Sequence, residues 1–495
     1  MANVLTQMKQ FPLDAWKFVK DRIDKIDLFD ETKADLQKDS PWYQLGALYY
    51  LAWIMVVASG LILIAFYIPT TSQAFDSIIN IRQNIPFGDI IRGFHKYGAD
   101  AMIIAATLRI YRMWFCAEYK NKGELTFILA IVLLLIAMYS GLTGYLLIWN
   151  QRAFWATKVF ATFPTYLDIT PANWHWPWES VAGPDKTWLI PNAIGAVTKV
   201  IGNLTHQGMT TSQILMGGSS IGQATMTRFF SLHFALSLIL LTVTELYFYQ
   251  NRLKRINLRW PAVVTVVAML LVTSIIFPAE MGSRANPEVT PLPILSDWYF
   301  LALYQMLKYM DPYWATVWTV GIPVITIALV FLDFGKETNP WRRPIFTTIA
   351  IMAFIQFIVF SLLIIANQAN IDRDPPYWYA HIILMITIGQ FWHWALYRQF
   401  LPMAIWVAFN IVSSAFYLYH WHVASADWFA QWLQLQGQVE WNPTNLYWNF
   451  LWFAYALLQA LIFAALWFAH AYSEQKRRAQ EESLALQRLA TEGAH

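Results

Sequence analysis

Two long apolar segments, each with one histidine near its start, constrain this chain more than any other feature. They are residues 91–115, which contain His95, and residues 228–250, which contain His233. Each is long enough to cross a bilayer as a helix, which takes about 20 apolar residues. An imidazole inside such a helix is costly and indicates a functional site. Two histidines at matching depth could be the axial ligands of one haem. The alternative is two unrelated histidines at helix ends, bonded to water or backbone.

The composition supports a membrane protein. Of 495 residues, 57% are apolar and only 13% are charged, whereas soluble domains usually carry about 25% charged residues. We therefore expect an all-α polytopic membrane protein. The net charge of +3 gives no indication of nucleic acid binding. The single cysteine, Cys116, excludes an internal disulfide, an iron–sulphur cluster held by this chain's own thiolates and a CxxCH haem attachment.

Apolar runs predict about ten transmembrane helices. The runs are 44–68, 93–117, 125–149, 229–250, 260–278, 314–333, 344–367, 378–398, 401–419 and 446–471. The short links at 118–124, 251–259 and 334–343 and the tail after 472 are basic. Basic loops stay in the cytoplasm, so we expect both termini to be cytoplasmic and the protein to lie in the cell (inner) membrane. The second and fourth spans then both run inward, which puts both histidines near the outer surface.

Two further features have open interpretations. Residues 1–40 contain no segment of signal-peptide kind and indicate either an amphipathic helix on the membrane surface or a short soluble arm. Gly60 and Gly144 lie in the first and third spans. They either leave room for a flat macrocycle, because glycine lets a ring approach the backbone, or serve ordinary helix packing.

Three motifs are similar to those of one family. They are GLTGYLLIWNQRAFWATKV at 141–159, MTRFFSLH at 226–233 and ANPEVTPLPILSDWYFLALYQML at 285–307. In this order, with helices between them, they resemble cytochrome b of Rieske/cytochrome b complexes, with photosynthetic-type cytochrome b and its subunit IV fused into one polypeptide. The similarity covers residues 40–335 and implies that the first four spans form a haem-binding bundle.

The resemblance divides the chain into five parts. Residues 1–40 would be a cytoplasmic-side segment, and 41–250 the haem bundle, in which 160–225 form an extracytoplasmic insertion. Residues 251–370 would correspond to a three-helix subunit IV with the quinol-site loop, 371–472 to three extra transmembrane helices, and 473–495 to a charged cytoplasmic tail.

The haem ligands differ from the family pattern. The family has four ligand histidines, two on each helix, and the outer pair matches His95 and His233. The inner positions hold Arg109 on one helix and Tyr247 or Phe248 on the other. Since arginine is not deprotonated in proteins, we expect one haem b on the outer side. The competing hypothesis is an inner haem ligated from elsewhere, with Arg109 pairing to a propionate. His393 and His470 are the candidate ligands, unless they are polar groups packed between helices.

The quinol motif also departs from the family. Its glutamate is replaced by Asp297 and the preceding proline by Ser296. A carboxylate beside an apolar pocket can accept a proton near neutral pH, and Tyr299 matches the motif tyrosine. Alternatively, Ser296 or Asp297 only caps the following helix. Arg92 and Lys96 flank His95 and are either propionate partners or interfacial charges.

The resemblance implies a quinol-oxidising subunit. One electron from quinol would go to a Rieske iron–sulphur protein and one to the haem held by His95 and His233, while Asp297 accepts a proton. Expected partners are that protein, cytochrome c or another extracytoplasmic carrier, and a second copy of the chain. Without an inner haem, a full Q-cycle is doubtful. The alternatives are a single-haem membrane anchor that exchanges electrons between the quinone pool and an extracytoplasmic oxidoreductase, and a haem-free scaffold.

Overall fold

The computed structural model describes the chain from residue 41 to 366, with gaps, and a few short segments outside this range. The described residues are 16–22, 41–120, 122–167, 211–248, 260–291, 295–309, 312–334, 336–366, 388–390, 392–397, 408, 479–480 and 482–484. Most of the predicted 160–225 insertion and of the predicted helices at 371–472 lies outside these residues.

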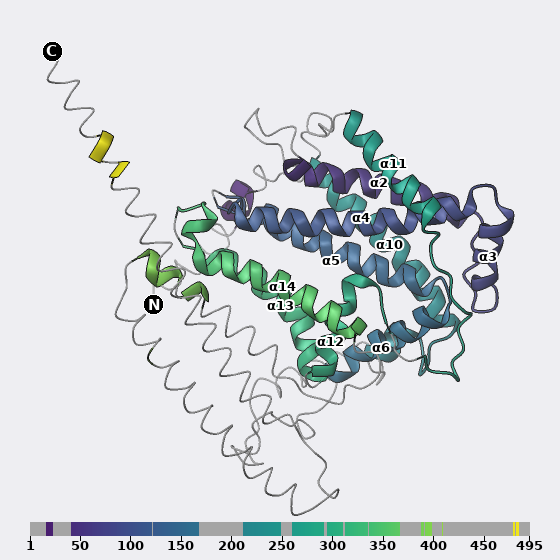
Figure 1. Ribbon diagram of the computed structural model, residues 1–495. Coiled ribbons are helices and arrows are strands. Elements are labelled where there is room, and N and C mark those ends of the chain that lie inside the picture. The colour runs from purple at the N-terminus through teal and green to yellow at the C-terminus, as the bar shows by residue number, and fades with distance from the viewer. Residues whose placement is uncertain are drawn as a thin grey trace, which may run out of the picture. The chain divides into compact units, whose positions relative to one another are not determined.

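The described elements are helical, as expected for an all-α membrane protein (Figure 1). In chain order they are η2 (Pro41–Gln44), α2 (Leu45–Ile64), α3 (Ala74–Asn84), α4 (Gly88–Phe115), α5 (Glu124–Leu146), α6 (Gln151–Leu167), α9 (Thr211–Met216), α10 (Gln223–Phe248), α11 (Trp260–Ile276), η4 (Trp298–Phe300), α12 (Leu301–Tyr309), α13 (Pro312–Leu332), η5 (Pro340–Arg342) and α14 (Pro344–Ala366). The predicted spans from 44–68 to 344–367 each correspond to one long helix, and α3 was not predicted.

The first four predicted spans, now α2, α4, α5 and α10, share one apolar core. Their side chains form a buried cluster because each helix is apolar on the face that meets the others. The cluster includes Ala47, Tyr49, Ala52, Trp53, Met102, Ile103, Ala105, Ala106, Leu133, Ala137, Leu142 and Leu240. The expected four-helix bundle is therefore present.

Four described helices are long and apolar enough to cross a membrane. They span Leu45–Ile64, Glu124–Leu146, Gln223–Thr242 and Pro344–Leu362, and Trp260–Ile276 and Trp318–Leu332 are shorter apolar helices. Helix α4 is longer, but it contains six charged residues, three of them buried arginines. A helix in lipid satisfies its own backbone hydrogen bonds, so these helices support a multi-pass membrane protein.

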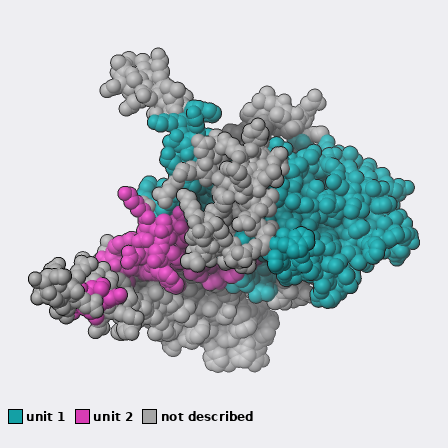
Figure 2. Space-filling view, turned by 90° about the horizontal axis from the view of Figure 1, so that it is seen from above, with its two compact units in different colours: residues 1–114, 118–334, 358–374 teal, residues 115–117, 335–357, 375–495 magenta. Residues whose placement is uncertain are grey.

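The chain forms two compact units (Figure 2). Unit 1 comprises residues 1–114, 118–334 and 358–374, and contains the bundle. At one end of it, the link before α5 contacts the end of α13: Lys120 Nζ lies 3.1 Å from one carboxylate oxygen of Asp333, and the Tyr119 hydroxyl donates to the other at 2.7 Å. Two links that the charge pattern places on the same side of the membrane are thus neighbours.

The N-terminal segment contacts the same region. Residues 16–20 are exposed and helical, and Arg22 donates two hydrogen bonds to the carboxylate of Glu124, at 3.0 and 3.2 Å. Lys122 pairs with Asp21 at 3.1 Å. This segment was expected to be either a surface helix or a soluble arm, and its described part is a helix tied to the start of α5.

Unit 2 comprises residues 115–117, 335–357 and 375–495. Its described part includes η5, the first half of α14 and residues 388–390 and 392–397. Gly389 packs on α14, where an added Cβ would lie 3.1 Å from Thr348 Cβ. The rings of Trp341 and Trp392 are 5.7 Å apart.

Candidate functional site

His95 of α4 and His233 of α10 face each other inside the bundle. Their ring centroids are 6.1 Å apart and the ring planes are inclined at 74°. Nδ1 of His95 lies 2.9 Å from the carbonyl oxygen of Val56, and Nδ1 of His233 lies 2.8 Å from that of Ser140. Both contacts require a protonated Nδ1, which leaves Nε2 as the basic nitrogen of each ring. Metal-ligating histidines are held in this way by a hydrogen bond from the second nitrogen.

A glycine makes room for each ring. A Cβ added to Gly60 of α2 would lie 2.9 Å from Cε1 of His95, and one added to Gly144 of α5 would lie 2.6 Å from Cε1 of His233. Both distances are shorter than carbon atoms tolerate without contact strain. In the structure an imidazole ring therefore lies against each glycine, that of His95 at Gly60 and that of His233 at Gly144. Room for a flat macrocycle at Gly60 and Gly144 stays a prediction.

The histidine pair fits a haem iron. A bond from a metal to an imidazole nitrogen is about 2 Å long, so two such bonds and the two rings place the centroids about 6 Å apart, close to the observed separation. Haem iron takes only its axial ligands from the protein, and two histidines from facing helices supply such a set. His95 and His233 would hold the iron through Nε2.

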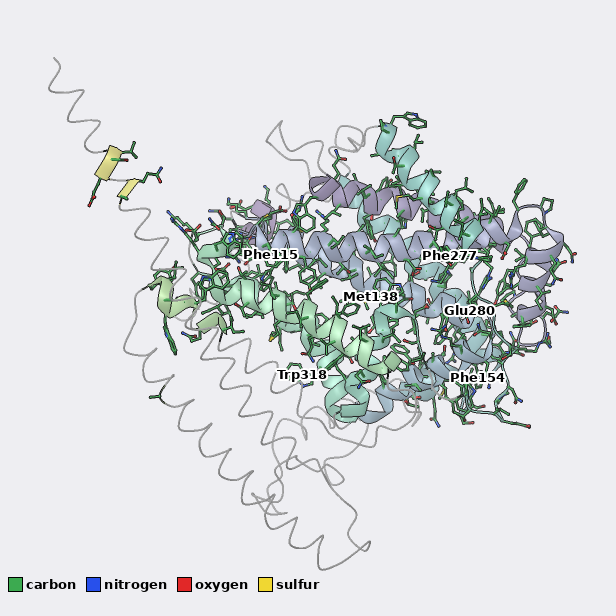
Figure 3. All side chains as sticks on the ribbon, in the orientation of Figure 1. Phe115, Met138, Phe154, Phe277, Glu280 and Trp318 are labelled. Carbon is green, nitrogen blue, oxygen red and sulfur yellow. The ribbon has the colours of Figure 1, made fainter. Side chains whose placement is uncertain are left out.

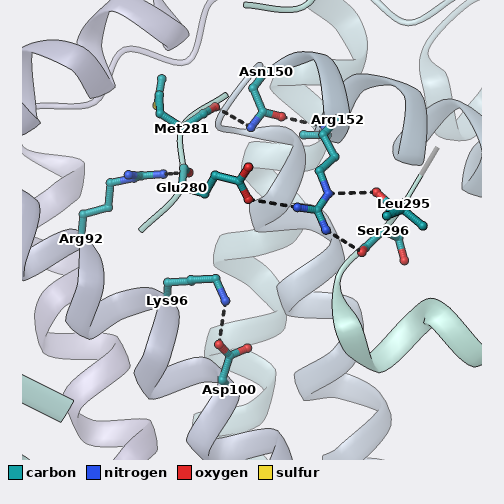
Figure 4. Close-up of polar contacts among 10 residues, drawn as sticks. Arg92, Lys96, Asp100, Asn150, Arg152, Glu280, Met281, Leu295 and Ser296 are labelled. Atoms are coloured by element: carbon teal, nitrogen blue, oxygen red, sulfur yellow. Dashed lines mark hydrogen bonds and ion pairs between the residues drawn. The ribbon is translucent and has the colours of Figure 1, made fainter. Parts of the chain in front are cut away.

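A second polar region lies at the start of α6, where it contacts the segment that follows α11 (Figure 4). Asn150 accepts a hydrogen bond from the amide of Ala153 at 2.7 Å, which caps α6, and donates one to the carbonyl of Met281 at 2.7 Å. Arg152 donates to the carbonyls of Leu295 and Ser296, each at 3.2 Å, and pairs with Glu280 at 3.0 Å. The start of α6 therefore holds both ends of the 279–297 segment. Figure 3 labels Glu280 on this segment and Phe154 on α6.

The turn before α6 has an unusual backbone. Trp149 has φ of 54°, although a bulky residue rarely adopts the left-handed region. Its side chain is buried, and its carbonyl accepts a hydrogen bond from the amide of Ala285 at 3.1 Å. The packing of the tryptophan and this contact hold the strained turn.

Asp297 lies at the end of the same segment, directly before η4. It occupies the N-cap position, but its side chain makes no capping hydrogen bond. Instead one carboxylate oxygen accepts from the hydroxyl of Tyr299 at 3.3 Å. Burial raises the pKa of Asp297, and the negative charge of Asp100 adds to this, whereas Lys96, Arg152 and the Tyr299 hydrogen bond act in the opposite direction. The side chain is thus directed to the tyrosine and not to the helix end.

Two family models match the chain. "Cytochrome b/b6/petB" matches residues 34–190 and 191–254, and "Cytochrome b(C-terminal)/b6/petD" matches residues 284–391. Together they cover about two-thirds of the chain and include both histidines and the Asp297 segment. The chain belongs to the bc-type cytochrome b family. The resemblance to a fusion of cytochrome b and subunit IV is confirmed by the order of the two matches.

Relatives and a solved structure agree with this assignment. The chain is 27% identical over 361 residues to the "Cytochrome bc complex cytochrome b subunit" of Chlorobaculum thiosulfatiphilum, covering 66% of this chain and 74% of that protein. It is 25% identical over 380 residues to "Cytochrome b" of Rhodospirillum rubrum, covering 71% and 83%. A chain of the structure titled "Hyperthermophilic respiratory Complex III" superposes with a TM-score of 0.56 at 22% identity, over 70% of this chain and 89% of that chain, which supports the fold.

The two basic residues predicted to flank the haem have protein partners in this cytochrome b. Arg92 is buried and donates to the carbonyls of Ala279 and Glu280, at 2.5 and 2.6 Å. Lys96 pairs with Asp100 at 2.7 Å. Because a guanidinium has five donors, Arg92 keeps others for a propionate. The role of both residues toward haem stays a prediction.

Three residues of this region were missed by sequence reasoning. Asp100 accepts a hydrogen bond from the indole of Trp298 at 2.9 Å. The hydroxyl of Tyr145 is buried and has no hydrogen-bond partner among the described residues, and Asp297, Arg152 and Glu280 are within its electrostatic reach. A charged residue in the second span was the available signal for Asp100. Tyr145 and Trp298 both lie in motifs that carry the family resemblance, but the sequence did not indicate the contacts of either side chain.

The bundle core also contains side chains from the part of α4 between His95 and Arg109. Tyr49 and Trp53 of α2 are buried in the shared core with Met102 and Ala106 of α4. Arg109 is buried at 4% exposure, and its charge acts on the hydroxyl of Tyr49. The side chains of Tyr247 and Phe248 and all of His470 lie outside the described residues. His393 is described, with its ring 4.7 Å from that of Tyr397.

Proposed function

We propose that this cytochrome b is the quinol-oxidising subunit of a membrane electron-transfer complex, with one haem b on the outer side of the bundle. The observation that carries the proposal is the pair of histidines on α4 and α10, directed at each other and each fixed through Nδ1. His95 and His233 would hold a haem, which would supply a one-electron acceptor. The electron partners would be a Rieske iron–sulphur protein and, beyond it, cytochrome c or another carrier outside the membrane.

The quinol pocket would lie between the start of α6 and Asp297. Oxidation of a quinol releases two protons, and the partly buried side chain of Asp297 is hydrogen-bonded to Tyr299 there and is not used as a cap. A base that accepts a proton from the substrate must be ionised, and one whose pKa is raised toward the working pH transfers that proton efficiently. The buried hydroxyl of Tyr145 is a second group that could bind the substrate oxygen.

Two observations support a single haem. The position 14 residues after His95 holds Arg109, which cannot ligate iron. The matching positions on α10 hold Tyr247 and Phe248, so the second pair of histidines is absent from both helices. The termini on the cytoplasmic side, a location in the cell membrane and a homodimer within the complex are parts of the same proposal. They rest on the basic links and on the resemblance.

The first test is the number of haems per chain. We expect the purified complex to contain one b-haem per copy of this chain by pyridine haemochrome, and a redox titration to show one step. His95→Ala and His233→Ala should each abolish that signal. His393→Ala is the matched control and should keep it.

Two haems per chain, or a haem retained in both ligand variants, would contradict the proposal. Haem without quinol oxidation would instead favour the membrane-anchor alternative, in which the chain exchanges electrons with a different extracytoplasmic oxidoreductase. A spectrum unchanged by either substitution would favour a scaffold.

A further inference from the structure

Asp100 connects the haem-bearing helix to the quinol motif. It lies on α4 one turn after Lys96, so that the two side chains share a face of the helix. One carboxylate oxygen accepts from Lys96 Nζ at 2.7 Å, as Figure 4 shows, and the other accepts from the indole nitrogen of Trp298 at 2.9 Å. The carboxylate is largely buried, with 18% of the side chain exposed. Hydrogen bonds to a buried carboxylate are shorter and stronger than those between neutral groups.

Trp298 in turn contacts Tyr299, which belongs to the proposed quinol site. Its ring contacts that of Tyr299 edge-on, with centroids 5.6 Å apart and planes at 90°. The Tyr299 hydroxyl donates to Asp297, and it lies so close to α5 that a Cβ on Gly141 would be 2.3 Å from it. The motif is therefore fixed on one side by Asp100 of α4 and on the other by the backbone of α5.

We propose that Asp100 is a positioning residue for quinol oxidation, which holds Trp298 against the helix that carries His95 and places a second negative charge beside Asp297. This inference rests on the proposed function, because it assigns Asp100 a part in the same reaction. The haem ligand and the proton acceptor would then be held at a fixed separation by one side chain. Misplacement of a reacting group by about 1 Å can cost about a hundredfold in rate.

Asp100 would also act on the charge of Asp297. The charged and titratable groups that act on Asp297 or lie within its reach are Lys96 and Asp100 of α4, Arg152 of α6, Tyr145 of α5 and Tyr299 of η4. Asp100 disfavours the ionised form of Asp297, and Lys96 favours it. Removal of the Asp100 charge should therefore lower the pKa of Asp297, and removal of the Lys96 charge should raise it.

The test uses variants of Asp100 in the full complex. Asp100→Asn keeps an acceptor for Trp298 and removes the charge, so we expect the acid limb of quinol oxidation to move to lower pH, with a loss at the optimum of about tenfold or less. Lys96→Met should move the limb to higher pH. Asp100→Leu also removes the contact to Trp298, and should raise KM and accelerate amide hydrogen exchange in residues 295–309. Asp100→Glu should restore the KM and the rate of hydrogen exchange of the unmodified protein.

Asp89→Asn is the matched control, because it removes a charge from the same helix where Asp89 pairs with Arg82 at 2.8 Å. It should leave the pH profile unchanged. The inference would be overturned if the acid limb of quinol oxidation lay at the same pH in Asp100→Asn and in the control, or if hydrogen exchange were unchanged in Asp100→Leu. Asp297→Asn distinguishes failure of this inference from failure of the proposed function. Full activity in Asp297→Asn would refute quinol oxidation through Asp297. Loss of activity in Asp297→Asn, together with unchanged activity and pH profile in the Asp100 variants, would refute only the role of Asp100.

Discussion

Each imidazole that would ligate iron is held between a backbone carbonyl and a glycine. The carbonyls of Val56 and Ser140 orient the rings, and Gly60 and Gly144 leave the space that the rings occupy. The orientation of a ligand is therefore determined by residues one helix away. A histidine at the right position is not sufficient if the facing helix presents a side chain there.

Substitution of these glycines should weaken haem binding. In Gly144→Ala the new Cβ would meet His233 at 2.6 Å, against 2.9 Å for His95 in Gly60→Ala, so we expect Gly144→Ala to lose more haem. Overpacking of this kind costs about 1–3 kcal/mol. Haem per chain after purification measures the loss. Gly321→Ala in α13 should retain haem, because its Cβ would lie 3.7 Å from Trp318. Equal haem content in all three variants would contradict the role of the two glycines.

The pH dependence of quinol oxidation should report Asp297. Burial raises the pKa of this carboxyl above its usual value of 3.8. A base is active when ionised, so the rate should fall as pH falls through that raised pKa, at a higher pH than for an exposed aspartate. Asp297→Asn should remove this limb and reduce the rate at neutral pH by about a hundredfold or more, with haem content unchanged. A limb that persists in Asp297→Asn would show that another group is the base.

At this scale the sequence selected candidate residues, whose roles stay predictions, and gave no indication of the contacts that support them. His95, His233, Asp297 and Tyr299 were chosen as candidates because each lies in a motif or at a depth that has a chemical meaning. Asp100 and Trp298 are 198 positions apart, and nothing in the local pattern of either indicates the other. The macrocycle role of Gly60 and Gly144 and the propionate role of Arg92 stay predictions; in the structure the glycines face the two histidines, and Arg92 donates to backbone carbonyls.

At the scale of elements, α6 organises the quinol region through its first turn. The motif at 141–159 includes the start of this helix, which continues to Leu167. Its cap was not predicted, because Asn150 follows Trp149 in a turn whose left-handed backbone no sequence rule assigns to tryptophan. Helix α3 was missed for a related reason: only five of its residues are buried, and its apolar pattern is too short to stand out between two transmembrane segments.

Loss of the cap of α6 should affect quinol binding more than loss of an equivalent helix cap elsewhere in the chain. Asn150→Ala loses the cap, worth about 1–2 kcal/mol, and the bond to Met281, so we expect faster hydrogen exchange in residues 279–291 and a higher KM for quinol. Asn150→Ser keeps a capping oxygen and loses the amide donor, and should show an intermediate effect. Asn339→Ala is the control, since Asn339 caps the exposed η5 by accepting from the amide of Trp341 at 3.0 Å. Equal rates of amide hydrogen exchange in residues 279–291 of Asn150→Ala and of the unmodified protein would show that Asn150 does not hold this segment.

At the scale of the whole molecule, the distribution of polar groups differs between the two ends of the bundle. The histidine pair, Asp100 and Asp297 lie toward the end where α4 begins, whereas the buried Arg109 and Arg112 lie toward the other end of α4. The helical membrane fold could be predicted from hydropathy, because a segment that crosses lipid must satisfy its own backbone. Which side chains meet in the core depends on contacts among four helices, so the sequence alone did not show it.

This asymmetry predicts how the complex responds to a membrane potential. If both electrons from quinol leave on the outer side, no charge crosses the membrane during turnover. Moving one charge across 100 mV costs about 2.3 kcal/mol, so a complex that sends an electron inward is slowed when a potential builds up. In sealed proteoliposomes we expect an ionophore to change the rate of quinol oxidation less than about twofold.

The control for that experiment is a direct measurement of the potential with a membrane dye, because an unresponsive rate is informative only if vesicles hold a potential imposed by a potassium gradient. An imposed potential, positive outside, should leave the rate unchanged by the same reasoning. Slowing by several-fold under that potential, relieved by the ionophore, would mean that an electron crosses the inner half of the bundle. Because Arg109 cannot ligate iron, that result would direct the search for an inner ligand to His393 and His470.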